Sequence, residues 1–144
     1  FTLYFSSFTI FMKPMAQLEN NAFFWQKLDT LYFSSSVVIT QPAGSAHPTY
    51  INLVYPVDYG FLSDTLSQDD SGIAVYKGSL SDNQVNTVII AADILKKDIE
   101  VKLLVGCSVA EEDAILRFVN QTDFQKTILI RRGNDVPSWG FSEQ

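Results

Sequence analysis

The strongest constraint on the fold is a nearly unbroken apolar run near the middle of the chain, residues 86–94 (NTVIIAADI). The run is rich in β-branched residues and has no polar face, so we expect a strand buried on both sides or nearly so. Residues 96–98 (KKD) then predict a turn, and residues 99–106 (IEVKLLVG) predict a second strand. These two strands should form a hairpin. Glu100 and Lys102 are two positions apart on the second strand, so we expect both on one face.

Further segments carry helical and strand patterns. Apolar residues recur every three or four positions over residues 16–32, which predicts an amphipathic helix. Ser108 and Glu111 form a capping box, which predicts a second helix ending near Asn120. Short runs rich in β-branched residues predict strands over residues 37–40, 73–76 and 127–132. Two helices and about five strands without regular alternation predict a small α+β domain, with the strands in a closed or partly open β-barrel.

Length and composition predict one globular domain and exclude two classes of partner. The chain has 144 residues, of which 47% are hydrophobic and 18% charged. Residues 1–14 begin without Met and are too short to span a bilayer, so we expect a leader or an added segment and no membrane partner. We expect the domain over residues 15–133 and a tail over residues 134–144. The net charge of −6 and the scattered Lys and Arg argue against a nucleic-acid groove.

The single cysteine, Cys107, excludes an intrachain disulfide and a cysteine-based zinc cluster. It follows an apolar run, so we expect a small buried residue in a protein of the reducing cytoplasm. A nucleophilic cysteine would need a partner histidine, and the one histidine is His47. His47 could contact a phosphate, act as a base near neutral pH or stabilise its turn, and these alternatives stay open.

Three short motifs carry a family resemblance. Residues 42–48 (PAGSAHP) and 55–60 (YPVDYG) are followed by an acidic loop, residues 69–74 (DDSGIA). In this order the motifs resemble the soluble inorganic pyrophosphatases of the family I type, and the chain looks like a short and degenerate member. The resemblance implies a pyrophosphatase-like, OB-like barrel and Mg²⁺-dependent hydrolysis of pyrophosphate to phosphate. It also implies a cytoplasmic homo-oligomer that binds pyrophosphate or another small phosphate compound.

The resemblance also implies a metal site, from which two acids are missing. The family's acidic loop has three carboxylates that bind magnesium, and only the first is kept here, as Asp69. Ser71 and Ala74 replace the other two and supply no charged oxygen. Asp70 occupies the family's glycine position and could replace the middle acid, which activates the attacking water. The implied magnesium ligands are therefore Asp69, Asp70 and Glu100.

Substrate contacts follow from the same resemblance. Tyr59 matches a phosphate-binding tyrosine, Lys102 matches a phosphate-binding lysine, and Lys126 is a faint match to a further lysine near the final helix. His47 joins Asp70 as a candidate catalytic residue. The family's phosphate-binding Arg lies on a hairpin that this chain is expected to lack.

Several interpretations of these residues remain. Acids also cap turns, and an acid and a base on one strand face are common on solvated edges. Loss of one well-placed electrostatic group in a catalytic site costs about 10²–10³ in rate. We therefore expect an inorganic diphosphatase-like hydrolase of reduced activity, or a pseudoenzyme that binds or regulates. A third hypothesis is a self-associating module, with aromatic residues of the first helix and Trp139 and Phe141 of the tail at the contact.

Overall fold

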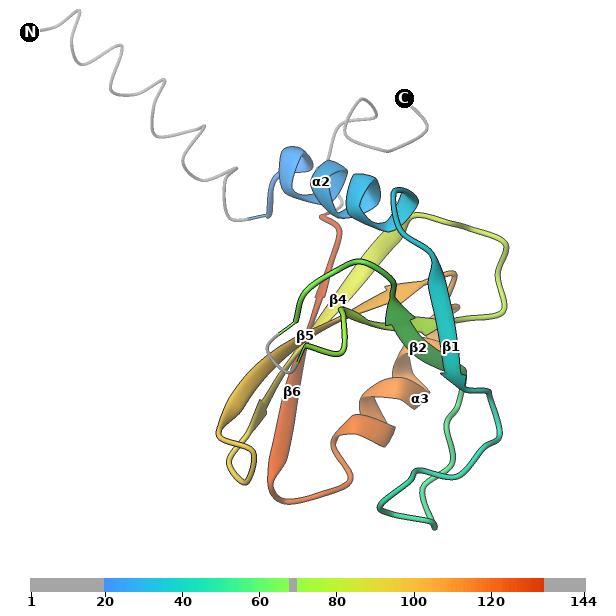
Figure 1. Cartoon of the computed structure of the whole chain (residues 1–144), viewed down its shortest axis with the longest axis vertical. Helices are drawn as coiled ribbons and strands as arrows, with labels where there is room; N and C mark the ends of the chain where they lie inside the picture. Colours follow the sequence, from blue (N-terminus) through green and yellow to red (C-terminus); the bar gives the residue numbers. More distant parts are fainter. Residues whose placement is uncertain (1–19, 68–69, 134–144) are drawn as a thin grey trace, which may run out of the picture.

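The computed structural model describes residues 20–67 and 70–133. This part of the chain folds into two helices around a six-stranded sheet (Figure 1). The helices are α2 (Ala22–Phe33) and α3 (Val109–Val119). The strands are β1 (Val37–Gln41), β2 (Asp58–Leu62), β3 (Ala74–Lys77), β4 (Val85–Asp93), β5 (Asp98–Val105) and β6 (Gln125–Arg131). The predicted segments 1–14 and 134–144 lie outside the described residues.

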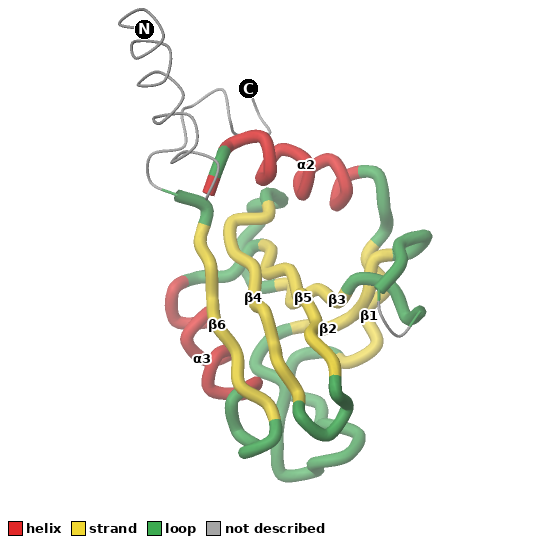
Figure 2. The backbone as a smooth tube through the Cα atoms, turned by 90° about the vertical axis from the view of Figure 1, so that its left-hand side faces the viewer, coloured by secondary structure: helices red, strands yellow, loops and turns green. Residues whose placement is uncertain are grey.

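The strands lie in the order β1-β2-β3-β5-β4-β6 (Figure 2). All neighbours are antiparallel except β3 and β5, which are parallel. The α+β class is confirmed, and so is the β4–β5 hairpin. The sheet has six strands where about five were expected, and in the described part of the chain β1 and β6 are open edges, so the barrel does not close.

The additional strand is β2, which contains Tyr59 and Gly60 of the motif 55–60 and was not predicted as a strand. Gly60 lies within the strand because β1 passes very close to it. A Cβ built at Gly60 would lie 1.9 Å from the backbone oxygen of Val38. Glycine is therefore required here for close backbone approach, not for a turn.

The helices cover opposite faces of the sheet. Consecutive strand residues point to opposite faces, and two buried clusters divide accordingly. Trp25 and Tyr32 of α2 pack with Val75, Val88 and Leu103. Ile115 and Val119 of α3 pack with the next residue of each of those strands, namely Tyr76, Ile89 and Leu104.

Two buried carboxylates tie the helices to the sheet. Asp29 of α2 accepts from Arg132 Nη2 at 2.7 Å and from the backbone N–H of Val85 at 3.0 Å. Glu112 of α3 accepts from the Thr87 hydroxyl and from Arg131 Nη2, the latter at 3.0 Å. Each carboxylate thus has hydrogen-bond partners that compensate its burial.

The predicted helix signals are present at both helices. Helix α2 falls within the predicted range 16–32, of which residues 16–19 lie outside the described part, and it begins at Ala22, where the Asn21 side chain caps it by accepting the N–H of Phe24 at 3.0 Å. The second begins with the predicted capping box of Ser108 and Glu111. Neither described helix is long and apolar enough to cross a membrane.

Cys107 is half-buried between β5 and α3. Its Sγ lies 3.8 Å from the Tyr76 carbonyl oxygen and 3.7 Å from that of Val105. Burial, together with the nearby carboxylates of Glu111 and Glu112, raises the pKa of the Cys107 thiol to about 12. A thiol with such a pKa is protonated at neutral pH, which argues against the nucleophilic alternative.

Candidate functional site

Lys102 is the centre of the candidate site. Its residue is 8% exposed, and its Nζ lies 3.2 Å from both Glu100 Oε2 and Tyr59 Oη. The ammonium group also lies 5.3 Å from the centre of the Tyr59 ring. The predicted placement of Glu100 and Lys102 on one face is confirmed, and Tyr59 joins them from β2 across the small side chain of Ala74, which pairs with Lys102.

The ammonium of Lys102 remains charged in this buried setting. Burial by itself would lower the pKa of Lys102. The Tyr59 hydroxyl and the Glu100 carboxylate more than offset burial, so the pKa lies above its usual value. Lys96 adds a second cation, with its Nζ 4.0 Å from Glu100 Oε1. Two ammonium groups thus face one carboxylate, and the group carries a net positive charge.

Two cavities meet at this group, and Tyr59, Lys96 and Lys102 line both. The first, here called the edge cavity, has a volume of about 480 Å³. It forms because β3 pairs only with the second half of β5, from Lys102 to Val105, and leaves residues 99–101 without a β3 neighbour. Glu100 lines this cavity, together with the apolar side chains Leu28, Leu31, Phe61 and Ile73.

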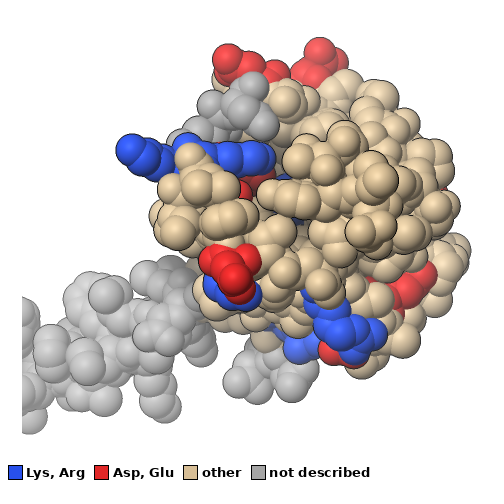
Figure 3. Space-filling model, turned by 90° about the horizontal axis from the view of Figure 1, so that it is seen from below, with Lys and Arg blue, Asp and Glu red and all other residues tan. Residues whose placement is uncertain are grey.

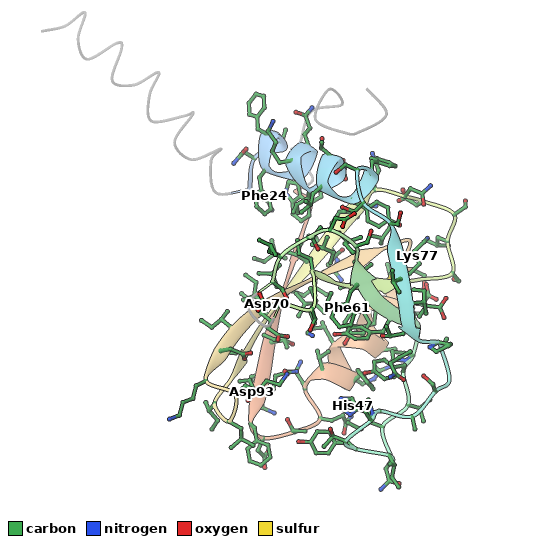
Figure 4. All side chains as sticks on the ribbon, in the orientation of Figure 1. Phe24, His47, Phe61, Asp70, Lys77 and Asp93 are labelled. Carbon is green, nitrogen blue, oxygen red and sulfur yellow. The ribbon has the colours of Figure 1, made fainter. Side chains whose placement is uncertain are left out.

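Residues on both sides of Asp69 and Asp70 border the edge cavity. Ser67 and Gly72 line it, and Gly72 has a left-handed φ of 98°. Phe61, at the centre of Figure 4, lines the same cavity from β2. The described residues on either side of Asp69 and Asp70 therefore line the same cavity as Glu100 and Lys102.

The second cavity, here called the aromatic cavity, has a volume of about 370 Å³. Its rings come from a short hairpin that precedes β2, from β2 and β3, and from α3 and the loop after it. They are His47, Tyr50, Tyr55, Tyr59, Tyr76, Phe118 and Phe124.

The motifs 42–48 and 55–60 build the short hairpin by contacting each other. Asp58 Oδ1 accepts the backbone N–H of Ala43 at 2.8 Å. The backbone N–H groups of Gly44 and Tyr55 donate to the carbonyls of Tyr55 and Ser45 at 2.9 Å each. The chain was expected to lack the family's arginine-bearing hairpin, and the short hairpin found here contains no arginine.

His47 has a structural role at the tip of this hairpin. Its Nδ1 accepts the backbone N–H groups of Thr49 at 3.0 Å and Tyr50 at 3.2 Å. The ring stacks on Tyr55, with 5.8 Å between ring centres and 7° between planes. Burial lowers the pKa of His47, and the charges of Lys96 and Lys102 lower it further. The accepting Nδ1 and the lowered pKa both favour the neutral ring, in which Nε2 carries the proton.

The remaining candidates lie apart from Lys102 or outside the described residues. Asp69 is outside them. Asp70 is exposed, has a left-handed φ of 63°, lines neither cavity, and lies far from His47 (Figure 4). Lys126 pairs with Ala92 on β4, and its Nζ donates to the Asn120 carbonyl at 3.3 Å. Strand alternation puts Lys126 on the opposite face from Lys102.

The described carboxylates do not fit a magnesium site. Magnesium in proteins needs several oxygen ligands in near-octahedral geometry. Among residues 20–67 and 70–133, no three His, Cys, Asp or Glu residues come together in a way that could hold a metal. Glu100, the acid at the edge cavity, is already paired with Lys102 and Lys96. The side chains around Lys102 are therefore better suited to holding an anion than a divalent cation.

Several residues of the site, Lys96 and Tyr50 among them, were not predicted from the sequence. Lys96 was predicted only as part of a turn, but it lies in the β4–β5 hairpin with its Nζ 4.0 Å from Glu100 Oε1. Tyr50 and Phe124 belong to loops that meet only in the tertiary structure.

On the face seen in Figure 3, the charged side chains of the described residues lie near the rim around a largely uncharged area.

No protein-family model and no curated protein sequence matches the chain. Solved structures similar to it include an inorganic pyrophosphatase from Helicobacter pylori, with a TM-score of 0.47 and 17% identity over 67% of this chain and 82% of that one. Another is an inorganic pyrophosphatase from Coxiella burnetii, with a TM-score of 0.45 and 16% identity over 66% and 82%. A third, described as an inorganic phosphatase from Anaplasma phagocytophilum, has a TM-score of 0.42 and 11% identity over 67% and 81%. At this level of structural similarity, the chemistry of the candidate site has to be inferred from its own side chains.

Proposed function

We propose that this chain is a pyrophosphatase-like protein that binds pyrophosphate or another small phosphate compound at the edge cavity and has lost efficient hydrolysis. The observation that carries the proposal is the buried, charged Lys102, which Tyr59 and Glu100 hold in place at 3.2 Å each. Lys102 and Lys96 would neutralise the phosphate, and Tyr59 would donate its hydroxyl. We expect the protein to act in the cytoplasm.

The same group of charges explains the proposed loss of turnover. Efficient hydrolysis of pyrophosphate with metal ions needs carboxylates that hold the ions and activate water. At the edge cavity the described acid is Glu100, and its oxygens lie 3.2 and 4.0 Å from lysine ammonium groups. A carboxylate in two ion pairs is a poor ligand for a further cation, whereas the excess ammonium charge favours an anion.

Calorimetric titration with pyrophosphate tests the binding. Because a buried hydrogen bond to a charged group contributes about 1.5–3 kcal/mol, Lys102→Met should weaken binding about ten- to hundredfold. Lys27→Met, on the exposed surface of α2, is the matched control and should bind as the wild type does. Equal affinities for the Lys102 and Lys27 variants, both folded by circular dichroism, would overturn the proposal.

A second candidate function is Mg²⁺-dependent phosphate hydrolysis with Asp69, Asp70 and Glu100 as ligands. What favours it is the position of Ser67 and Gly72, which line the edge cavity on either side of the acidic pair. Phosphate release from pyrophosphate across Mg²⁺ and Mn²⁺ concentrations measures it. Activity that Asp69→Asn abolishes supports hydrolysis, and release at the blank rate with every ion rejects it.

Self-association is a further proposal for the same molecule. Phe23, Phe24 and Phe33 of α2 are 60%, 49% and 57% exposed, so this helix carries three large apolar rings that a second copy could cover. Light scattering measures the mass directly. A monomer at high protein concentration removes this proposal and leaves phosphate binding untouched.

A further inference from the structure

The aromatic cavity is lined mainly by rings, which binding of inorganic phosphate does not require. Two of its lining residues, Lys96 and Lys102, would already serve the phosphate in the proposed function. Seven others carry aromatic rings, which offer flat apolar faces and no charge. Small-molecule sites in proteins are typically of this kind, mostly apolar with a few placed polar groups, and span about 300–1,000 Å³. At about 370 Å³ the cavity lies within that range.

The inner rings form a fixed wall. Tyr55 packs against Tyr59 with 5.3 Å between ring centres and 26° between planes, and against Phe118 at 4.7 Å. Tyr59 packs in turn against the buried Tyr76 at 4.8 Å. Burial raises the pKa of Tyr55 and that of Tyr76, so both hydroxyls stay neutral and can donate at physiological pH.

Two outer rings are open to solvent. Tyr50, from the hairpin before β2, and Phe124, from the loop between α3 and β6, are each 41% exposed and line the same cavity. Tyr50 is supported at 5.2 Å by the His47 ring, which the hairpin holds in place. The cavity therefore presents partly uncovered aromatic faces at its mouth, on two independent loops.

The polar groups favour an anion at the inner end. Lys102 and Lys96 line the cavity, and Glu100 does not. Among the described residues, Asp93 is the one acid in the lining, on the side away from His47 in Figure 4, and two lysines against one acid leave an excess of positive charge. Positive charge at one end and open rings at the other match a molecule that joins a phosphate to a flat ring.

We infer that the aromatic cavity binds a nucleoside phosphate, with the base against Tyr50 and Phe124 and the phosphate on Lys102 and Lys96. The inference rests on the proposed function only in using the same two lysines for phosphate. It adds the ligand class: a phosphorylated planar ring in place of inorganic pyrophosphate. Every base has a π-face, so the rings by themselves select a base without selecting which one.

Calorimetry with four probes separates the two halves of the ligand. AMP carries ring and phosphate, adenosine only the ring and sugar, ribose 5-phosphate only the sugar and phosphate, and pyrophosphate no ring. We expect AMP to bind at least about tenfold more tightly than ribose 5-phosphate, because stacking on an aromatic side chain contributes that much. Equal affinity for AMP and ribose 5-phosphate would overturn the inference.

Ring variants test the location. Tyr50→Ala and Phe124→Ala should each weaken AMP binding about tenfold, and Tyr50→Phe should retain it. Ile51→Ala, on the same hairpin and 74% exposed, and Phe33→Ala, an exposed ring on α2, are the matched controls and should bind AMP as the wild type does. Unchanged AMP affinity in both Ala variants, with folding verified by circular dichroism, contradicts the placement.

The outcomes distinguish this inference from the proposed function. If pyrophosphate binds in a Lys102-dependent manner and AMP does not bind, the inference fails and the proposed function stands. If AMP binds and pyrophosphate does not, the inference stands and the pyrophosphate proposal fails. In the variants at Tyr50 and Phe124, pyrophosphate affinity should not change, because neither residue lines the edge cavity.

Discussion

Replacing Asp29 with asparagine tests whether the buried ion pair between α2 and the end of β6 stabilises the fold. The side chains of Asp29 and Arg132 are 2% and 3% exposed, and Oδ2 lies 2.7 Å from Nη2. The asparagine oxygen could still accept the Val85 N–H, but the neutral amide would face the Arg132 guanidinium without compensating its charge. Removal of one partner from a buried pair costs about 3–5 kcal/mol, because the remaining charge is left without compensation.

This loss is large for a protein of this size. Typical domains have a free energy of unfolding of about 5–15 kcal/mol, so Asp29→Asn should remove about a fifth of it or more. The melting temperature should fall by roughly 10–20 °C. Urea unfolding is the assay, followed by the fluorescence of Trp25, which is fully buried and lies 5.5 Å from the Arg132 guanidinium carbon.

The matched control is an exposed pair. Asp113 and Arg117 are 62% and 67% exposed at the side chain, so Asp113→Asn should cost less than about 0.5 kcal/mol. The double variant Asp29→Leu with Arg132→Leu should be less destabilised than Asp29→Asn, because no unpaired charge remains. If Asp29→Asn and Asp113→Asn reduce the free energy of unfolding equally, the buried pair does not have the role assigned to it.

Three further predictions concern other residues. Gly60→Ala should reduce the free energy of unfolding, measured in urea, by more than about 3 kcal/mol, because the new Cβ would lie 1.9 Å from the backbone of β1. The control Gly133→Ala, whose Cβ would have no neighbour nearer than 3.5 Å, should change it by less than about 0.5 kcal/mol. Similar losses in the two variants would contradict the close approach at Gly60. Because the pKa of His47 is lowered in the folded protein, the unfolded chain binds more protons, and the free energy of unfolding should fall as pH drops below about 6.5. His47→Asn should remove part of this pH dependence. Parallel curves of the free energy of unfolding over pH 5–8 for the wild type and the variant would refute this role of His47. Cys107, with its pKa of about 12, should react slowly with a thiol reagent at pH 8 in the native protein and rapidly in urea. Fast labelling of the native protein would show that burial does not protect the thiol.

Local patterns determined much of the secondary structure. The capping box at Ser108 fixes the start of α3, and the apolar run 86–94 and the turn 96–98 specify the β4–β5 hairpin. Alternation along β5 put Glu100 and Lys102 on one face, where they form an ion pair. These features depend on residues close together in the chain, so the sequence carries them directly.

Tertiary structure decided the rest, because it depends on which distant segments meet. Gly60 has a turn-like sequence, and only the approach of β1 makes it a strand residue. The pairing of Tyr59 with Lys102 needs β2 beside β3 and β3 parallel to β5. The same arrangement leaves Asp70 exposed and away from both cavities, and gathers Tyr50 and Phe124 around one cavity. The sequence alone thus determined which charged groups the chain possesses, and packing across the sheet determined which of them act together.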